Sequence, residues 1–271
     1  MEAAIGSATR PDNEEPLLRE TLDGGVLRLT MNRPAARNAL SIALMEALRR
    51  ALDTAAAQRE CRVVVIAGAG PAFCAGHDLR ELRGDPSRAF YERTFACCSA
   101  LMQQILALPK PVIAEIHGIA TAAGCQLVAT CDLAVAAEDA RFATPGVNIG
   151  LFCSTPMVAL TRAVGRKPAM EMLLTGELID AATAKALGLV NRIVPSADLS
   201  AATLDLARRI AAKSAFTVAI GKEAFYRQAE MGLADAYRHA GEVMTRNMLA
   251  RDAGEGIDAF LAKRPPVWQD A

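Results

Sequence analysis

Short buried strands alternate with helices over the first half of the sequence, and this alternation restricts the fold more than any other feature. Residues 62–67 are dense in β-branched side chains and end at Gly68, which predicts a buried strand. Residues 111–116 and 132–136 are further predicted strands. Helical segments separate these strands, so we expect an α/β body.

Local signals place the remaining elements of this body. Asp23-Gly24-Gly25 lies between two short strand-like runs, which is a hairpin signal. Ser41 opens a helix whose apolar residues recur at spacings near 3.6,. The other expected elements are a helix at residues 87–108, a loop at 118–124, a helix at 125–130, and short strands at 141–143 and 190–194.

From Thr155 onward the pattern is nearly all helical, and residues 198–263 read as three or four amphipathic helices,. Residues 1–16 have neither a basic start nor an apolar stretch, so they do not resemble a signal peptide. We expect a disordered tail at residues 1–16, a core at residues 17–195 and a helical oligomerisation region at residues 196–271. No apolar run approaches the roughly 20 residues of a membrane span.

Composition and missing motifs exclude several classes of function. Lys plus Arg and Asp plus Glu both number 30, so the basic excess of a nucleic-acid-binding protein is absent. There is no phosphate-binding loop and no G-x-S-x-G elbow. Gly68-Ala69-Gly70 follows a strand, but Phe73 occupies the third glycine position of the dinucleotide-binding motif,. The three histidines form no H-x-x-x-H pair, so we expect no metal.

The seven cysteines show no C-x-x-C spacing, so neither a zinc site nor a disulfide framework is expected,. Most lie beside apolar residues and are typical of small buried thiols. This usage indicates a reducing compartment, and we expect a cytoplasmic protein.

Two loops of small residues each join a predicted buried strand to the start of a helix. In the first, residues 72–79, Gly76 permits an unusual backbone angle and a close ligand approach,, and Asp78 with Glu81 fits a capping pattern. The second loop spans residues 117–127. For either loop alone, an ordinary tight turn from strand to helix is the favoured interpretation. Together they could supply two free N–H groups that hold one carbonyl oxygen and stabilise an oxyanion.

Ordered motifs along most of the chain, from about Leu17 to Trp268, resemble the enoyl-CoA hydratase/isomerase (crotonase) family. The two loops carry Phe73-Cys74-Ala75-Gly76-His77-Asp78-Leu79 and Gly118-(x)5-Gly124-Cys125-Gln126-Leu127-(x)3-Cys131-Asp132. Further matches are Asn32-Arg33-Pro34, Arg37-Asn38-Ala39-Leu40, Phe142-Ala143-Thr144-Pro145, Leu174-Thr175-Gly176, Ala186-Leu187-Gly188-Leu189-Val190 and Phe260-Leu261-Ala262-Lys263-Arg264. Residues 142–156 resemble the mitochondrial "enoyl-CoA hydratase domain-containing" subfamily and its bacterial relatives.

The resemblance implies a ClpP-like spiral of strand-strand-helix units, with C-terminal helices that drive homotrimers or hexamers. It implies an acyl-CoA thioester as ligand, with no separate cofactor because CoA is part of the substrate. The oxyanion donors would be the N–H groups of His77 and Ala123. The expected CoA-binding residues are Arg37, Ala75, His77, Asp78, Leu79, Arg80 and Gly124, with Phe260 and Lys263 from a neighbouring subunit.

The sequence departs from the family's hydratases at two positions. Hydratases of the family use two glutamates, which would fall at Gln126 and Gly146. Glutamine cannot act as a base near neutral pH, and glycine has no side chain. We therefore expect weak hydration. The open alternatives are isomerisation, thioester hydrolysis, decarboxylation or acyl-CoA binding without chemistry.

Substitute catalysts are the Cys153 thiol as nucleophile, which lacks an identifiable base, and the His77 imidazole as base. For Asp132, Glu115 and His117 we favour structural roles. Met102, Met157, Leu160 and Phe152 could line an acyl pocket, but core packing is the simpler role for most of them,.

Overall fold

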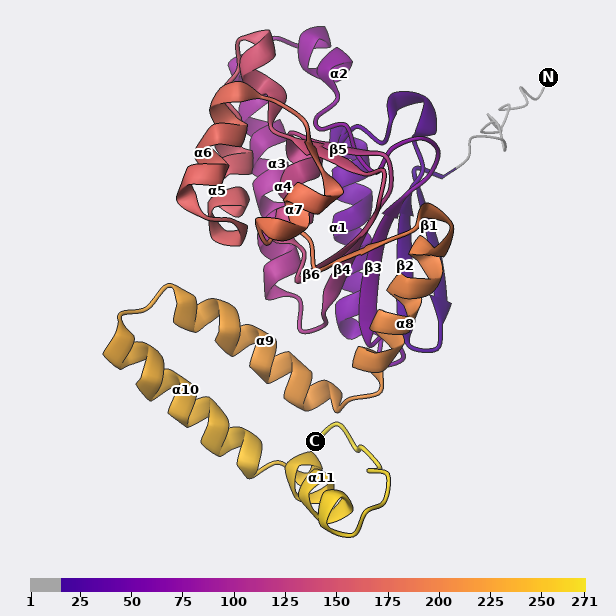
Figure 1. The fold of residues 1–271 in the computed structure, drawn as a ribbon, viewed down its shortest axis with the longest axis vertical. Coiled ribbons are helices and arrows are strands. Elements are labelled where there is room, and N and C mark those ends of the chain that lie inside the picture. The colour runs from indigo at the N-terminus through magenta and orange to yellow at the C-terminus, as the bar shows by residue number, and fades with distance from the viewer. Residues whose placement is uncertain (1–15) are drawn as a thin grey trace, which may run out of the picture.

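A six-stranded sheet forms the centre of the computed structural model, which describes residues 16–271. The first two strands form an antiparallel hairpin, and all other neighbouring strands are parallel (Figure 1). Parallel neighbours need crossover connections, and helices supply them, so the expected α/β body is confirmed. In spatial order the strands are β1 (Leu18–Asp23), β2 (Val26–Met31), β3 (Val63–Gly68), β4 (Val112–Ile116), β6 (Leu133–Ala137) and β9 (Arg192–Val194).

Strand β3 shows why this sheet is buried on both faces. Val64 and Ile66 join a large core cluster, whereas Val63 and Val65 join a second cluster, because successive side chains point to opposite faces of a strand. All four side chains are fully buried, and each such burial contributes about 1.5–3 kcal/mol. The large cluster includes residues of α1 (Ile42–Ala57), α3 (Arg88–Ala107) and α4 (Ala123–Thr130), and the second includes residues of α8 (Leu199–Ala211).

One strand of a smaller three-stranded sheet lies in a segment that was expected to be a loop, and another is the short strand expected at residues 141–143. Within residues 118–124 the chain forms β5 (Ile119–Thr121), which pairs in parallel with β7 (Arg141–Ala143), and β7 pairs with β8 (Ile179–Asp180). Three residues are too few to show a strand period, so the loop prediction was wrong there. The remaining elements are α2 (Leu79–Gly84), α5 (Ser154–Ala163), α6 (Arg166–Thr175), α7 (Ala181–Ala186) and the 3-10 turns η1 (Pro34–Ala36), η2 (Pro145–Ile149) and η3 (Ser196–Asp198).

Three C-terminal helices form an arm that extends away from the sheet (Figure 1). They are α9 (Ala215–Ala229), α10 (Leu233–Met248) and α11 (Arg251–Leu261). The expected helical region at residues 196–271 also contains α8, but α8 packs on the sheet through Leu199, Leu206 and Ala207. Within this region α8 therefore belongs to the body, and only α9, α10 and α11 extend away from the core.

One buried ion pair anchors the arm to the body. Lys222 of α9 donates to Asp132 Oδ2 at 2.7 Å, and Tyr226 donates to Asp132 Oδ1 at 2.7 Å. The Lys222 ammonium also donates to two main-chain carbonyls, at 2.9 and 3.0 Å. Asp132 lies just before β6. These contacts explain its structural role, because it joins α9 to the central sheet.

Two further expectations concern the N-terminal tail and membrane-spanning helices. The tail at residues 1–16 lies outside the described residues except for Pro16. Over residues 16–271, no helix has both the length and the apolar character that a bilayer span requires.

Candidate active site

The main-chain amide of His77 is free because of how its loop pairs with Leu40. Leu40 donates to the carbonyl of Gly76 at 2.8 Å, and Asp78 donates to the carbonyl of Leu40 at 3.2 Å. In such a parallel bridge the residue between these two contacts directs its own N–H away from the partner. Within residues 16–271, the His77 N–H has no hydrogen-bond acceptor.

The second free amide belongs to Ala123, the first residue of α4. Its N–H is one of the donors that a helix N-terminus cannot satisfy internally, and no acceptor for it occurs in the described part of the chain. Ala122 before it has φ 50° and ψ −116° and donates to the carbonyl of Ala143 at 2.9 Å. This turn fixes the direction in which the helix starts.

Backbone pairing brings the two loops together. Cys74 donates to the carbonyl of Ile119 at 3.1 Å and accepts from the amide of Thr121 at 3.0 Å. A Cβ atom on Gly76 would lie 2.9 Å from Ala122 Cβ and 3.5 Å from the Ala123 nitrogen. The free amides of His77 and Ala123 therefore come from loops that touch beside Gly76.

Gly124 permits the closest contact between the loops. A Cβ atom there would lie 2.1 Å from the carbonyl oxygen of Cys74, so no side chain fits. Two free amides on loops in contact are the kind of donors from which an oxyanion hole is built.

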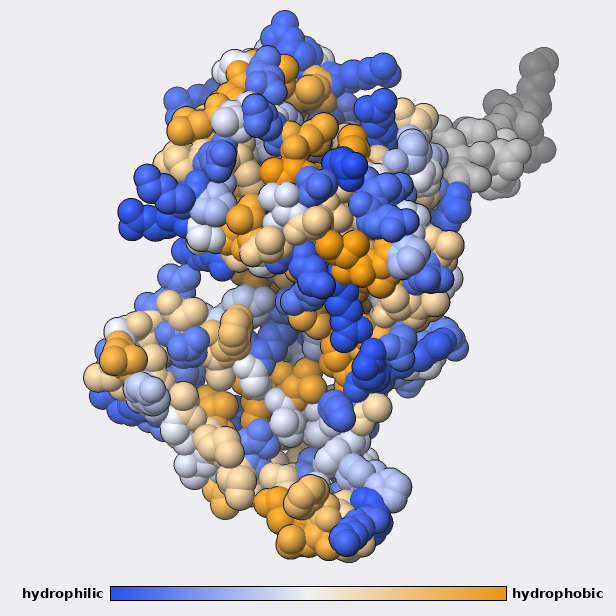
Figure 2. Space-filling model, in the orientation of Figure 1, coloured by the Kyte–Doolittle hydropathy of each residue, from blue (hydrophilic) through white to orange (hydrophobic). Residues whose placement is uncertain are grey.

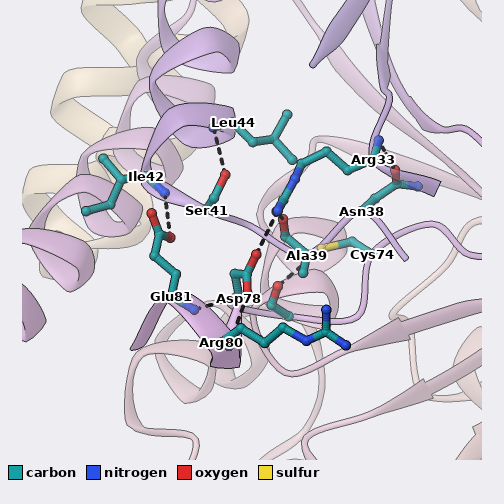
Figure 3. A network of polar contacts seen from close by, with 11 residues as sticks. Arg33, Asn38, Ala39, Ser41, Ile42, Leu44, Cys74, Asp78, Arg80 and Glu81 are labelled. Carbon is teal, nitrogen blue, oxygen red and sulfur yellow. Dashed lines mark hydrogen bonds and ion pairs between the residues drawn. The ribbon is translucent and has the colours of Figure 1, made fainter. Parts of the chain in front are cut away.

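Arg33 connects the N-terminal segment to the first loop (Figure 3). Its guanidinium donates to Asp78 Oδ2 at 2.7 Å and to the carbonyl of Ala39. Asp78 Oδ1 in turn caps α2 by accepting from the amides of Arg80 and Glu81. This confirms Asp78 as the cap, but Glu81 does not complete a capping box, because the Asp78 amide donates to Leu40 instead. Burial raises the pKa of Asp78, but the Arg33 guanidinium and the two amides outweigh it and hold that pKa below its usual range.

Asn38 and Glu81 complete this network of polar contacts (Figure 3). The fully buried Asn38 amide donates to the carbonyls of Ala69, just before the first loop, and of Ala72, at its start. Glu81 Oε2 accepts from the amide of Ile42 at the start of α1. The first loop and the start of α2 are thus held by hydrogen bonds to the segment before α1 and to the start of α1.

The His77 side chain lies against α3 and makes no hydrogen bond within the described residues. Its ring meets Phe95 edge to face, with the centroids 5.6 Å apart, and both ring nitrogens are enclosed without a partner. Burial lowers the pKa of His77 below its usual 6.5, against a smaller opposing effect of the Leu40 backbone. The imidazole is therefore neutral near pH 7.

Gln126 lies on α4, three residues after Ala123, and is 4% exposed. Its Oε1 accepts from the Cys98 thiol of α3 at 3.9 Å. Burial raises the pKa of Cys98 to about 12, so this thiol stays protonated and acts as the donor. The amide is held between α3 and α4.

Gly146 lies in η2 against the segment that follows it. A Cβ atom at this position would lie 2.6 Å from the Leu151 carbonyl oxygen and 2.9 Å from Cys153 Sγ. Burial raises the pKa of Cys153, against a smaller opposing effect of the Gly146 backbone. A protonated thiol is a poor nucleophile, so the geometry does not support Cys153 in that role.

The expected CoA-binding residues fall into two groups. Ala75, His77, Asp78, Gly124 and the exposed Leu79 lie on the two loops, and the exposed Arg80 follows the first loop in α2. Ala75 donates to the carbonyl of the exposed Arg37 at 3.0 Å. Phe260 is 82% exposed on α11, and Lys263 follows it. In a single chain, α11 lies at the opposite end of the molecule from α2 (Figure 1).

Other residues singled out in the sequence have structural contacts. Glu115 forms a two-point ion pair with Arg28, and His117 Nε2 lies 2.8 Å from the carbonyl oxygen of Gly70. Met102 and Leu160 are buried in the core, whereas Phe152 and Met157 are 43% and 38% exposed. In the range 16–271 no group of His, Cys, Asp and Glu side chains is placed to hold a metal ion.

Sequence reasoning missed Arg33 and Cys98 as site residues. Asn32-Arg33-Pro34 was available as a signal, since it belongs to the N-terminal motif, but the motif does not indicate which residue Arg33 contacts. Cys98 gave no signal beyond an apolar neighbourhood, because its partner Gln126 lies 28 residues away.

Comparisons with known proteins identify the family of the chain. The family model "Enoyl-CoA hydratase/isomerase" matches residues 21–271. The human "Enoyl-CoA hydratase domain-containing protein 3, mitochondrial" is 46% identical over 97% of this chain and 86% of its own. The "2,3-dehydroadipyl-CoA hydratase" of Escherichia coli is 38% identical over 89% of this chain and 94% of its own.

Solved structures confirm the fold. The crystal structure of an enoyl-CoA hydratase from Mycobacterium smegmatis is 56% identical, with a TM-score of 0.92 over 94% of this chain and 99% of that chain. The crystal structure of the human domain-containing protein 3 is 45% identical, with a TM-score of 0.91 over 93% of this chain and all of that chain. The expected crotonase fold is thus confirmed, and the chain belongs to the enoyl-CoA hydratase/isomerase family.

Proposed function

We propose that this protein binds an acyl-CoA thioester and polarises its carbonyl group between the amides of His77 and Ala123. One observation carries the proposal: two amides without acceptors, within residues 16–271, come from loops so close that Gly76 and Gly124 admit no side chain. Removing one such donor typically lowers a rate by about 10²–10³-fold. No separate cofactor takes part, because CoA enters as part of the substrate.

The proposed site lacks the two proton-transferring side chains that a hydratase uses. Gln126 and Gly146 stand where the hydratases' two glutamates are expected, and neither residue can transfer a proton. Hydration of an enoyl-CoA would then be slow. The same oxyanion hole could serve isomerisation, thioester hydrolysis or decarboxylation, and binding without chemistry is the remaining possibility.

The exposed Arg37 and Arg80 beside the first loop are our proposed contacts for the CoA nucleotide. Phe260 and Lys263 would join them from a second copy of the chain, in a homotrimer or hexamer. We also propose a reducing compartment, because all seven cysteines are free thiols, and we propose the cytoplasm. The relatives whose names include "mitochondrial" make fractionation of the source cells the necessary check.

Infrared difference spectroscopy with a thioester labelled at the carbonyl carbon tests the oxyanion hole without requiring turnover. We expect the carbonyl stretch of bound butyryl-CoA to move to lower frequency. Gly76→Ala should abolish most of this shift, because its Cβ would press on Ala122 at a φ of +102°. Gly84→Ala is the matched control, since nothing lies within 4 Å of its Cβ.

The unmodified protein gives the decisive result of this test, whatever the stability of the variant. Bound butyryl-CoA with an unshifted carbonyl would contradict the oxyanion hole. Failure to bind any CoA ester would contradict the proposed function as a whole.

A steady-state assay with crotonyl-CoA tests the expectation of slow hydration. We expect turnover well below about 10 s⁻¹, the usual enzyme median, and at least a tenfold gain in Gln126→Glu. Gly146→Glu is not a simple restoration, because Leu151 and Cys153 occupy the space that its side chain would enter. Turnover at or above the median in the unmodified protein would contradict weak hydration. If hydration is slow, a screen of products from several acyl-CoA thioesters would identify the reaction.

A further inference from the structure

The chain passes from the body into the arm between α8 and α9 (Figure 1), and a cavity of about 210 Å³ lies at this junction. It is bordered by Arg62 and Lys110, which precede β3 and β4, and by residues at the start of α9. The two loops of the candidate active site instead follow the opposite ends of β3 and β4. Because a strand rises about 3.3 Å per residue, the length of β3 separates the two places by roughly 16 Å.

Three cationic side chains border this cavity, but only one carboxylate does. The cations are Arg62, Lys110 and Lys213, and the carboxylate is Asp270. Asp270 Oδ2 pairs with Arg62, and its Oδ1 accepts from the amide of Ala215 at 2.7 Å. This carboxylate neutralises Arg62 and leaves the charges of the two lysines unbalanced.

The Lys110 ammonium has only neutral partners in the described part of the chain. It donates to the carbonyls of Ala55 and Gln58. Burial lowers the pKa of Lys110, against a smaller opposing effect of Cys61, and the Arg62 charge lowers it further. An anion in the cavity would stabilise the charged form of this lysine.

Most of the remaining wall is apolar. Its residues come from the segment before β4, from α8 and from α9, and they are Pro109, Ile210, Phe216, Val218 and Ala219. The cavity is smaller than the roughly 300–1,000 Å³ that drug-sized ligands occupy. Unbalanced positive charge beside a short apolar wall fits a small anion that carries an aliphatic chain.

We propose that this cavity binds the anion of a short aliphatic carboxylic acid, with the carboxylate toward Lys110 and Lys213 and the chain against the apolar wall. The bound acid contacts the body through Lys110 and the arm through Val218 and Ala219, so it fixes the direction in which α9 leaves the body. The inference goes beyond the proposed function and does not depend on it, since no residue of this cavity belongs to the candidate active site.

Calorimetric titration of the purified full chain with acetate, butyrate and hexanoate tests the site. We expect hexanoate to bind, with an affinity that rises about fourfold for each methylene group added along the series. Hexanol lacks the charge and inorganic phosphate lacks the chain, so each should bind at least about tenfold more weakly than hexanoate. Saturating butyryl-CoA should leave the affinity for hexanoate unchanged, because the two ligands occupy different places.

Two variants test the wall and the charge separately. Ala219→Leu fills part of the cavity and should weaken hexanoate binding by about tenfold or more. Lys213→Met removes an exposed cation and should weaken it by about two- to fivefold. The matched controls are Ala229→Leu and Lys185→Met, which replace exposed residues of α9 and α7 away from the cavity and should change nothing.

A third variant should act in the opposite direction. Asp270→Asn removes the one carboxylate at the cavity and frees Arg62, so hexanoate should bind at least about twofold more tightly. A general disturbance of the junction would weaken binding instead. In the unmodified protein, hexanoate should also slow hydrogen exchange at residues 214–220.

The failures of this inference and of the proposed function are distinguishable. Absence of saturable hexanoate binding, or equal affinity for all three acids, would overturn the inference. Loss of hexanoate binding in the presence of butyryl-CoA would also overturn it, because the acid would then occupy the acyl-CoA site. Unchanged affinity in both Ala219→Leu and Lys213→Met would place the acid elsewhere and overturn it too. Failure of butyryl-CoA to bind would overturn the proposed function alone.

Discussion

At Ala122 the backbone takes φ 50° and ψ −116°, a conformation that costs a residue with a Cβ atom about 1–3 kcal/mol. This strained conformation occurs where the chain turns sharply into α4 and leaves the Ala123 amide free. Ala122 Cβ also faces Gly76, where a second Cβ would come within 2.9 Å. The strained backbone at Ala122 therefore lies at the contact between the two loops.

Replacing Ala122 by glycine should stabilise the protein by about 1 kcal/mol. Glycine removes the strain, and its greater freedom in the unfolded chain offsets only about 0.5–1 kcal/mol of that gain. Urea denaturation measures the change. Ala56→Gly on the exposed face of α1 is the matched control and should cost up to about 1 kcal/mol,. A loss of stability in Ala122→Gly would show that the turn is not strained.

His77 should make stability depend on pH. Its pKa is lowered by burial, so below the usual value of 6.5 the unfolded state binds more protons than the folded state. The contribution is therefore fully present above pH 6.5 and is lost as the pH falls. We expect the free energy of unfolding to decrease between pH 7.5 and 5.5, and to decrease less in His77→Gln. Equal decreases in both proteins would assign the effect to other groups.

At the scale of elements, the ion pair of Arg33 and Asp78 joins the segment before α1 to the cap of α2. Both side chains are mostly buried, with exposures of 22% and 14%, so solvent screens the pair only partly. Arg33→Met should destabilise the protein by about 1–3 kcal/mol, because Asp78 loses a charged donor. It should also reduce the infrared shift of a bound thioester, because the His77 amide lies in the same loop.

Arg33→Lys provides the test of this positioning role. Lysine keeps the charge but lacks the planar fork that reaches Asp78 and the Ala39 carbonyl together, so it should restore stability more fully than it restores the infrared shift. If Arg33→Met leaves the shift unchanged, the pair stabilises the fold without positioning the amide.

The contact between α9 and the body should be the most sensitive part of the arm. Lys222 and Asp132 have side-chain exposures of 7% and 15%. Removing one partner of such a pair leaves a buried charge and typically costs about 3–5 kcal/mol. We expect this loss for Lys222→Met in chemical denaturation, with faster hydrogen exchange in α9. The exposed Lys213→Met is the control, and a loss below 1 kcal/mol for Lys222→Met would contradict the anchoring role.

At the scale of the whole molecule, the sequence predicted the parts that depend on local patterns. Residues 62–67 were expected to be a buried strand from their β-branched side chains, and Ser41 was expected to open a helix; both are observed. Long-range contacts were not predictable in this way. The ion pair of Arg33 and Asp78 spans 45 residues, and the pairing of Cys74 with Ala120 spans a similar stretch. Only the family resemblance placed His77 and Ala123 in one site.

The arm has a surface that a lone chain leaves uncovered. Leu233, Tyr237, Leu249 and Phe260 are 76%, 76%, 83% and 82% exposed, and Figure 2 shows apolar surface at the far end of the arm, over α11. Large exposed apolar patches indicate protein–protein contacts. Because α11 also carries Phe260, association of copies is the route by which this residue could reach a CoA site.

We therefore expect a homotrimer or hexamer, with a mass in light scattering of three or six times the 28.7 kDa chain. Leu249→Glu combined with Phe260→Glu should shift the mass toward one chain, because buried carboxylates without partners oppose association. Leu22→Glu on β1, away from the arm, should leave the mass unchanged. If Phe260 serves the site of a second copy, the dissociated variant should also bind butyryl-CoA more weakly. A monomeric unmodified protein with unimpaired binding would confine the site to one chain and remove Phe260 and Lys263 from it.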